Sequence, residues 1–98
     1  MDQKKADILA FLHQHVFDPI LNSPTASKKL KMGVQYTIMR MNERDAAGIW
    51  QYYWSAIVGT DRSIRFAAEM RNEGFTRFED PDVLEQFRIR FNEEWLKS

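Results

Sequence analysis

An uncharged run from Ala46 to Gly59, AAGIWQYYWSAIVG, constrains the fold of this chain more than any other segment. It holds two tryptophans, two tyrosines, two isoleucines and a valine. Each buried aromatic side chain removes on the order of 150–250 Å² from water, and burial stabilises a fold by roughly 25 cal/mol per Å². The rest of the chain must therefore pack around this run, and we expect it to form the core.

The spacing of the large residues predicts that this run is a helix. One helical face collects five of its apolar side chains, namely Ala46, Trp50, Tyr53, Trp54 and Ile57. Other apolar residues lie elsewhere around the wheel, so the helix is apolar on nearly every side, which is typical of a helix buried centrally or shared with a partner. Asn42 is the expected N-cap and Gly59 the expected C-terminal stop. The run is too short to span a bilayer, which needs about 20 residues.

The segments before this run also have helical patterns. Residues 2–17 predict a first helix, which we expect Pro19 to kink or end, because proline disfavours a helical residue before it. A turn follows at residues 22–25. Residues 27–41 have helical spacing, but part of this segment also alternates as a strand does; we favour the helix, because a lone strand would have no partner in the chain.

Two further helices are predicted after the central run. The first is capped by Thr60 or Asp61 and stopped by Gly74, with Phe75 folding back onto its last turn. The second opens with Asp80-Pro81, in the preferred order of cap then proline, and its apolar stripe continues to Trp95. The whole chain, residues 1–98, therefore predicts a single all-α domain, a compact bundle of about five helices around the central aromatic-rich helix.

Composition narrows the classes of function. The chain has no cysteine, so thiolate metal sites and cysteine nucleophiles are excluded and the fold does not depend on disulfides. Fourteen basic and fourteen acidic residues cancel, so no overall field attracts nucleic acid or anionic lipid. The charged start of the chain does not have the pattern of a signal peptide, and we expect a cytoplasmic protein with no membrane association.

The sequence contains no arrangement typical of a catalytic or metal site. His13 and His15 are two residues apart, so on a helix their side chains point about 200° from each other and cannot bind one ion together. No serine lies in a nucleophile motif and the four glycines are scattered, which excludes a glycine-rich phosphate loop. We therefore expect a protein that is not an enzyme and has no cofactor, metal or catalytic residue.

One basic stretch leaves nucleic-acid binding open as an alternative. Its five cations are Lys28, Lys29, Lys31, Arg40 and Arg44. Such a cluster can bind phosphates, and a helix-turn-helix can be drawn from the second and third helices. The third helix, however, would have to read bases with side chains that belong in a core, so we prefer a solvated basic face.

The large number of aromatic residues is the basis for the function that we favour. Thirteen per cent of the chain is aromatic, more than a bundle of this size can readily bury, and aromatic residues and methionine are enriched at protein interfaces. We therefore predict a protein-interaction or regulatory module that forms a homodimer. The predicted contact residues are Met32, Met39, Ile49, Trp50 and Tyr52. A small-ligand binder with an aromatic pocket, served by His15 or Tyr53, is a third possibility.

Overall fold

The computed structural model describes residues 2–58 and 65–98, with the side chains of residues 2–55 and 66–98. In these ranges the protein is helical without any strand, which confirms the predicted all-α class. The elements are α1 (Gln3–Leu12), the π-helical turn η1 (His13–Phe17), α2 (Asp18–Leu21), α3 (Lys28–Asn42), α4 (Ala46–Gln51), the π-helical η2 (Tyr52–Val58), α5 (Arg65–Asn72), the 3-10 turn η3 (Arg77–Glu79), α6 (Pro81–Arg90) and α7 (Glu93–Lys97).

The first helix does not end at the proline. α1, η1 and α2 follow one another directly and continue to Leu21. Pro19 has no N–H to donate, and the turn before it is π-helical, with the Asp18 N–H bonded to the His13 carbonyl. The proline therefore coincides with a widened turn. The prediction that it would end the helix is corrected, and the kink remains a prediction.

α3 is a helix, and the strand alternative is excluded. Ser27 caps it, and the Ser27 hydroxyl oxygen accepts a hydrogen bond from the Leu30 N–H at 3.0 Å. Its buried face carries Leu30, Val34, Thr37 and Met41. The helical spacing thus prevails over the short alternation in the same segment, because a full helix can bury one continuous face.

The central helix begins later than predicted. Asn42 still belongs to α3, and Asp45 is the N-cap, with its carboxylate accepting from the Gly48 N–H at 2.8 Å. Ile49 and Tyr53 are fully buried in the core that the helix forms with its neighbours. The predicted stop at Gly59 and the predicted caps Thr60 and Asp61 lie outside the described residues.

α5 ends in the chain reversal at Gly74 that the sequence predicts. Gly74 has φ +89°, in the left-handed region that favours glycine. The Phe75 N–H bonds to the Met70 carbonyl at 2.8 Å and the Gly74 N–H to the Arg71 carbonyl at 3.1 Å. These two bonds define a Schellman ending, so the prediction at this position is confirmed.

The last predicted helix is two helices. α6 begins at Pro81 after Asp80, as expected, but ends at Arg90. Asn92 then starts α7, because its side-chain oxygen accepts from the Trp95 N–H at 2.7 Å. The expectation of one helix through Trp95 is therefore corrected, since an asparagine cap competes with the apolar periodicity that continues across it.

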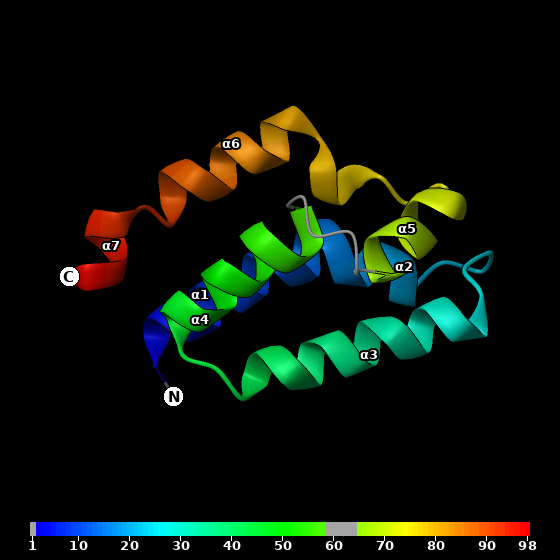
Figure 1. Cartoon of the computed structure of the whole chain (residues 1–98), viewed down its shortest axis with the longest axis horizontal. Helices are drawn as coiled ribbons and strands as arrows, with labels where there is room; N and C mark the ends of the chain where they lie inside the picture. Colours follow the sequence, from blue (N-terminus) through cyan, green and yellow to red (C-terminus); the bar gives the residue numbers. More distant parts are fainter. Residues whose placement is uncertain (1, 59–64) are drawn as a thin grey trace.

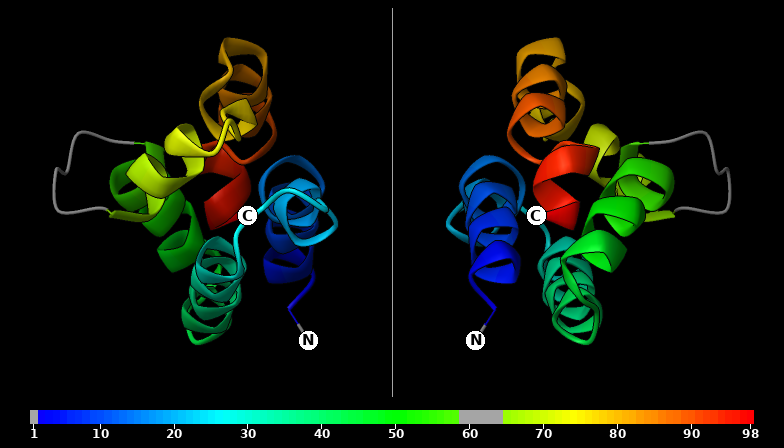
Figure 2. Two further views of the ribbon diagram at one scale, coloured as in Figure 1. Left: turned by 90° about the vertical axis from the view of Figure 1, so that its right-hand side faces the viewer. Right: turned by 90° about the vertical axis from the view of Figure 1, so that its left-hand side faces the viewer.

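The helices form a compact body whose principal extents are 40 × 27 × 23 Å. α3 and α6 lie at opposite edges, and the first helix and α4 lie between them (Figures 1 and 2). α7 folds back towards the start of α1, where the Lys4 ammonium bonds to the carbonyl of Ser98. Among the described residues, no helix is long and apolar enough to cross a membrane.

Candidate interaction surface

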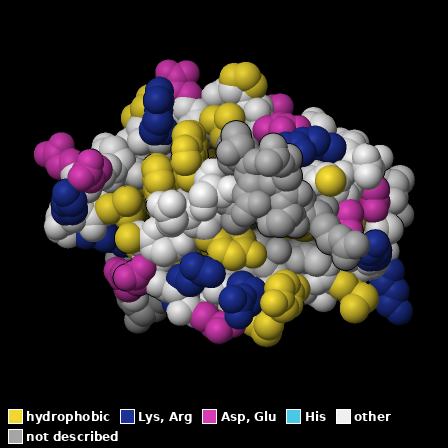
Figure 3. Space-filling model, viewed as in Figure 1, with side chains coloured by type: hydrophobic (Ala, Val, Ile, Leu, Met, Phe, Trp, Pro, Cys, Tyr) yellow, Lys and Arg dark blue, Asp and Glu magenta, His cyan; other side chains and the backbone are white. Residues whose placement is uncertain are grey.

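The outer face of α3 carries a row of large apolar side chains in water. Met32, Tyr36 and Met39 are 59, 57 and 53% exposed. Their spacing of four and three residues places them within about 60° of one another around the helix axis, at 100° per residue. We call these three residues the α3 stripe. Apolar and charged side chains alternate along the lower edge of the molecule, where α3 lies (Figure 3).

The stripe is exposed because α3 has two apolar faces. Leu30, Val34 and Met41 are completely buried on the inner face. A helix at the edge of a bundle can turn only one face to the core, so apolar side chains on the other face remain in water. Gly33 also faces inward, where a Cβ atom would lie 3.5 Å from the Phe66 ring and thus within ordinary contact distance.

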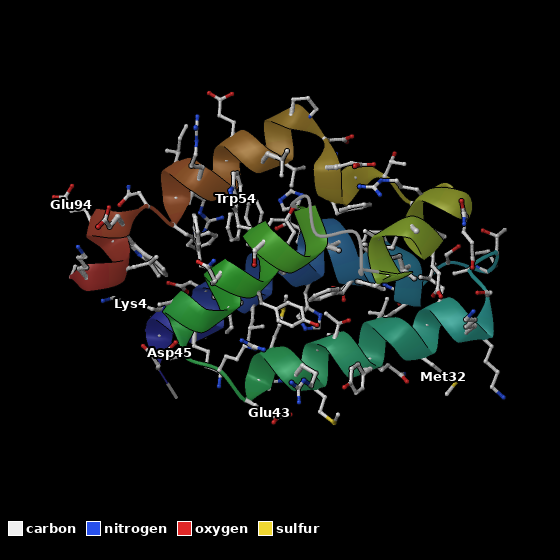
Figure 4. All side chains as sticks on the ribbon, viewed as in Figure 1. Lys4, Met32, Glu43, Asp45, Trp54 and Glu94 are labelled. Atoms are coloured by element: carbon white, nitrogen blue, oxygen red, sulfur yellow. The ribbon has the colours of Figure 1, made fainter. Side chains whose placement is uncertain are left out.

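Charged side chains lie at both ends of the stripe, with lysines at its start and both Arg40 and Glu43 at its end. Lys28 and Lys29 are exposed at the start of α3, whereas Glu43 is exposed where the helix ends. Lys29 also pairs with Glu69 of α5 at 3.4 Å. Glu43 and Met32 lie towards opposite ends of the lower edge of α3 (Figure 4). A surface that is apolar in the middle and charged at its ends resembles the core and rim of a protein interface.

The structure divides the five predicted contact residues between surface and core. Met32 and Met39 lie on the α3 stripe. Ile49 is fully buried, so its assignment to an interface is wrong, because it faces the core and not the solvent. Trp50 and Tyr52 are half-buried; the Trp50 ring stacks on Trp54 at 5.6 Å, and the Arg44 guanidinium covers the Tyr52 ring at 4.8 Å.

Tyr36 is the member of the stripe that the sequence-based prediction missed. Its position four residues after Met32 and three before Met39 is the signal that could have identified it. In the sequence-based prediction Tyr36 enters only through the alternation typical of a strand, although the helix is favoured for this segment. Tyrosine is among the residues enriched at interfaces, so its place in the middle of the stripe matters for any partner.

The predicted basic residues do not gather into one phosphate-binding patch. Lys28, Lys29 and Arg40 are exposed, whereas Lys31 and Arg44 are half-buried. From Lys28 to Arg40, α3 advances about 18 Å at 1.5 Å per residue, and the apolar stripe occupies the face between them. The Arg44 guanidinium packs over the Tyr52 ring. The cations therefore flank an apolar surface and do not converge.

His15 lies beside a small cavity and not in a metal site. A cavity of about 220 Å³ is lined by His15, Met70, Phe75 and Arg77 among others. The His15 ring packs 4.4 Å from Phe11, and its Nδ1 lies 3.3 Å from an Arg77 nitrogen. Desolvation, with the positive charge of Arg77 as a second cause, lowers the pKa of His15. Packing alone explains the contact of the neutral His15 ring with the Arg77 guanidinium as well as a ligand site would.

The other residues considered for chemistry are engaged in the fold. The Tyr53 hydroxyl donates to the Phe78 carbonyl at 2.6 Å in the core, and burial raises the pKa of this hydroxyl. His13 Nδ1 lies 3.0 Å from an Asp18 carboxylate oxygen. In the part of the chain that the structure describes, no three histidine, aspartate or glutamate side chains come together as metal ligands could.

Comparison with known proteins identifies no relative of this chain: no family model, curated protein or solved structure matches it.

Proposed function

We propose that this protein is a non-enzymatic interaction module of the cytoplasm that forms a homodimer through the outer face of α3. The observation that carries the proposal is the α3 stripe, because three large apolar side chains on one helical face are each more than half exposed. Soluble monomers rarely leave contiguous apolar patches in water, and such patches mark interaction sites. Methionine and tyrosine are also enriched where proteins meet.

The proposed homodimer keeps one of the two helices that the sequence predicts for the contact. Among the described side chains of the central helix, Tyr53 is fully buried and Trp50 and Trp54 are half-buried. Where the structure describes side chains, the neighbouring exposed apolar ones are those of the α3 stripe, which includes the predicted Met32 and Met39. The zero formal charge of the chain weakens repulsion between copies, which favours self-association through that face.

The test is light scattering on a sizing column over a range of protein concentrations. We expect a mass that rises from monomer to dimer, because one helical face is smaller than the roughly 800 Å² per partner of a standard interface and the association is then weak. Tyr36→Lys places a charge in the middle of the stripe and should keep the protein monomeric at every concentration.

Ile89→Lys is the matched control. Ile89 is 61% exposed on α6, at the opposite edge of the molecule from α3, so the same change there should leave the dimer intact (Figure 2). A wild-type protein that stays monomeric at the highest concentration contradicts the proposal. A dimer that Tyr36→Lys does not weaken contradicts the choice of surface, and co-eluting material that absorbs at 260 nm would favour the nucleic-acid alternative.

A further inference from the structure

We propose that the two copies pair through α3 in antiparallel orientation, with the two-fold axis passing between Gln35 and Tyr36. This inference rests on the proposed homodimer and specifies its geometry. A two-fold interface uses the same patch on both copies, so every residue on it must meet a complementary position of the same helix. The sequence and exposure of α3 decide which orientation satisfies that condition.

The apolar residues of α3 satisfy this condition of complementarity around the proposed two-fold axis. Met32 and Met39 are equally distant from the midpoint between residues 35 and 36, on either side of it. In an antiparallel pair, Met32 of one copy therefore lies opposite Met39 of the second copy, twice by symmetry. Tyr36 lies next to the axis, where its ring can pack against Tyr36 of the second copy. All three side chains of the stripe then leave water together.

Two charged residues at the ends of α3, Lys28 and Glu43, also lie opposite each other in this register. Lys28 and Glu43 are also equally distant from the axis, and both are exposed. Antiparallel pairing brings Lys28 of each copy opposite Glu43 of the other. Parallel pairing would instead bring lysine opposite lysine and glutamate opposite glutamate, which is repulsive. The helix dipoles agree, because antiparallel helices place each positive N-terminal end beside a negative C-terminal end.

The remaining cations of α3 are compatible with this arrangement. Lys29 has a partner within its own chain, since its ammonium lies 3.4 Å from the Glu69 carboxylate. Arg40 is exposed beside the stripe, near the level of Met32 of the second copy. Arginine can lay its aliphatic stem along such an apolar side chain and keep its guanidinium in water. These two residues thus flank the paired surface. Lys31 is at the level of Arg40 of the second copy in this register, but the two lie about 180° apart around the helix axis, so these like charges are on opposite flanks of the stripe.

Disulfide trapping tests the geometry directly, because the chain has no cysteine of its own. Three single-cysteine variants are needed: Tyr36→Cys, Met32→Cys and Met39→Cys. At a helix separation of about 8 Å, the facing Cα atoms come within the 4.4–6.8 Å that a disulfide requires. Under mild oxidation we expect Tyr36→Cys to form covalent dimers, while Met32→Cys and Met39→Cys each stay monomeric on a non-reducing gel.

A mixture of Met32→Cys with a size-tagged Met39→Cys protein should give the mixed disulfide in preference to either self-linked species. In a parallel pair the result is reversed: each methionine variant links to itself and the mixture gives no mixed product. That reversed result overturns the antiparallel geometry and leaves the homodimer standing. Ile89→Cys, exposed on α6, is the control for random collision.

A charge exchange gives a second, independent readout. Lys28→Glu and Glu43→Lys should each weaken the dimer, by roughly fivefold, since each replaces two attractive contacts with repulsive ones. An equimolar mixture of the two variants should recover the wild-type affinity, because each copy then supplies the charge that the other lacks. Failure of the mixture to associate better than either variant overturns the pairing of residues 28 and 43. Monomeric wild-type protein overturns both the geometry and the proposed function.

Discussion

Tyr53 is a residue whose polar atom ties two distant parts of the chain together. Its hydroxyl reaches from the central helix to the Phe78 carbonyl in η3, 25 residues later, and both residues are almost completely buried. Tyr53→Phe leaves the carbonyl without its donor, and an unsatisfied buried group costs about 1–3 kcal/mol. We expect the free energy of unfolding to fall by that amount in urea titrations at low protein concentration, where the monomer prevails.

The control for this change is Tyr36→Phe. The Tyr36 side chain is more than half exposed, so loss of its hydroxyl should alter the free energy of unfolding by less than about 0.5 kcal/mol. Equal effects of the two substitutions would mean that the hydrogen bond to Phe78 contributes nothing specific to stability.

At the residue scale, the sequence shows which residues are suited to a cap or a contact better than it shows which of them take that role. Asn42 and Asp45 are both good caps, and only the end of α3 decides that Asp45 caps the central helix. The sequence does not predict that Ile49 is buried, because a helix with apolar side chains all round offers no clue to which of them face solvent. Met32 and Met39 lie at the surface, as their spacing of seven residues opposite the apolar face of their own helix predicts.

At the scale of the elements, two glycines predict stability changes of opposite sign. Gly74 has φ +89°, and a Cβ atom there would meet no other atom within 4 Å, so the penalty for Gly74→Ala is purely conformational. A residue other than glycine pays about 1–2 kcal/mol in this left-handed region. We expect Gly74→Ala to lower the free energy of unfolding by that amount.

Gly33 is the counterpart within a helix. Gly33→Ala removes the entropic cost of glycine in α3, which is about 0.5–1 kcal/mol, and the new methyl lies at ordinary contact distance from Phe66. Circular dichroism during thermal unfolding should show a higher melting temperature for Gly33→Ala and a lower one for Gly74→Ala. A decrease for both would show that the space beside Phe66 is tighter than 3.5 Å implies.

Local chemistry explains which element boundaries could be predicted. The reversal at Gly74 depends on a glycine and the start of α6 on a proline at its first position, and both act over a few residues. The Asp80 side chain makes no capping hydrogen bond. The widened turn before Pro19 and the break at Asn92 could not be predicted, because in both places the apolar periodicity continues across a local interruption. Packing of the flanking helices decides whether such an interruption is absorbed or becomes a new helix.

At the scale of the whole molecule, the sequence predicts a helical core around Trp50 and Tyr53 but not the orientation of the helices around it. The inner face of α3 could be predicted from its spacing, whereas the exposure of its outer face depends on α3 being at the edge of the body (Figure 1). An edge position is set by how all the helices pack together. The α3 stripe is therefore a property of the assembled fold and not of its segment alone.

The aromatic cluster around Phe87 joins α6 to the first helix and to the central helix. The Phe87 ring on α6 lies 5.6 Å from Phe11 of the first helix and 4.6 Å from Tyr53 of the central helix. The indole rings of Trp50 and Trp54 each stack on it at 6.2 Å. Phe87 is itself fully buried, so its side chain joins α6 to both helices beneath it.

Phe87→Ala should consequently be among the most damaging single substitutions in the chain. Replacing a buried phenylalanine with alanine costs about 3–5 kcal/mol, against a total of roughly 5–15 kcal/mol for a domain of this size. Ile89→Ala, two residues along α6 but exposed, should cost less than about 0.5 kcal/mol. Urea unfolding followed by tryptophan fluorescence measures both, and comparable losses would mean that α6 does not depend on this cluster for its position.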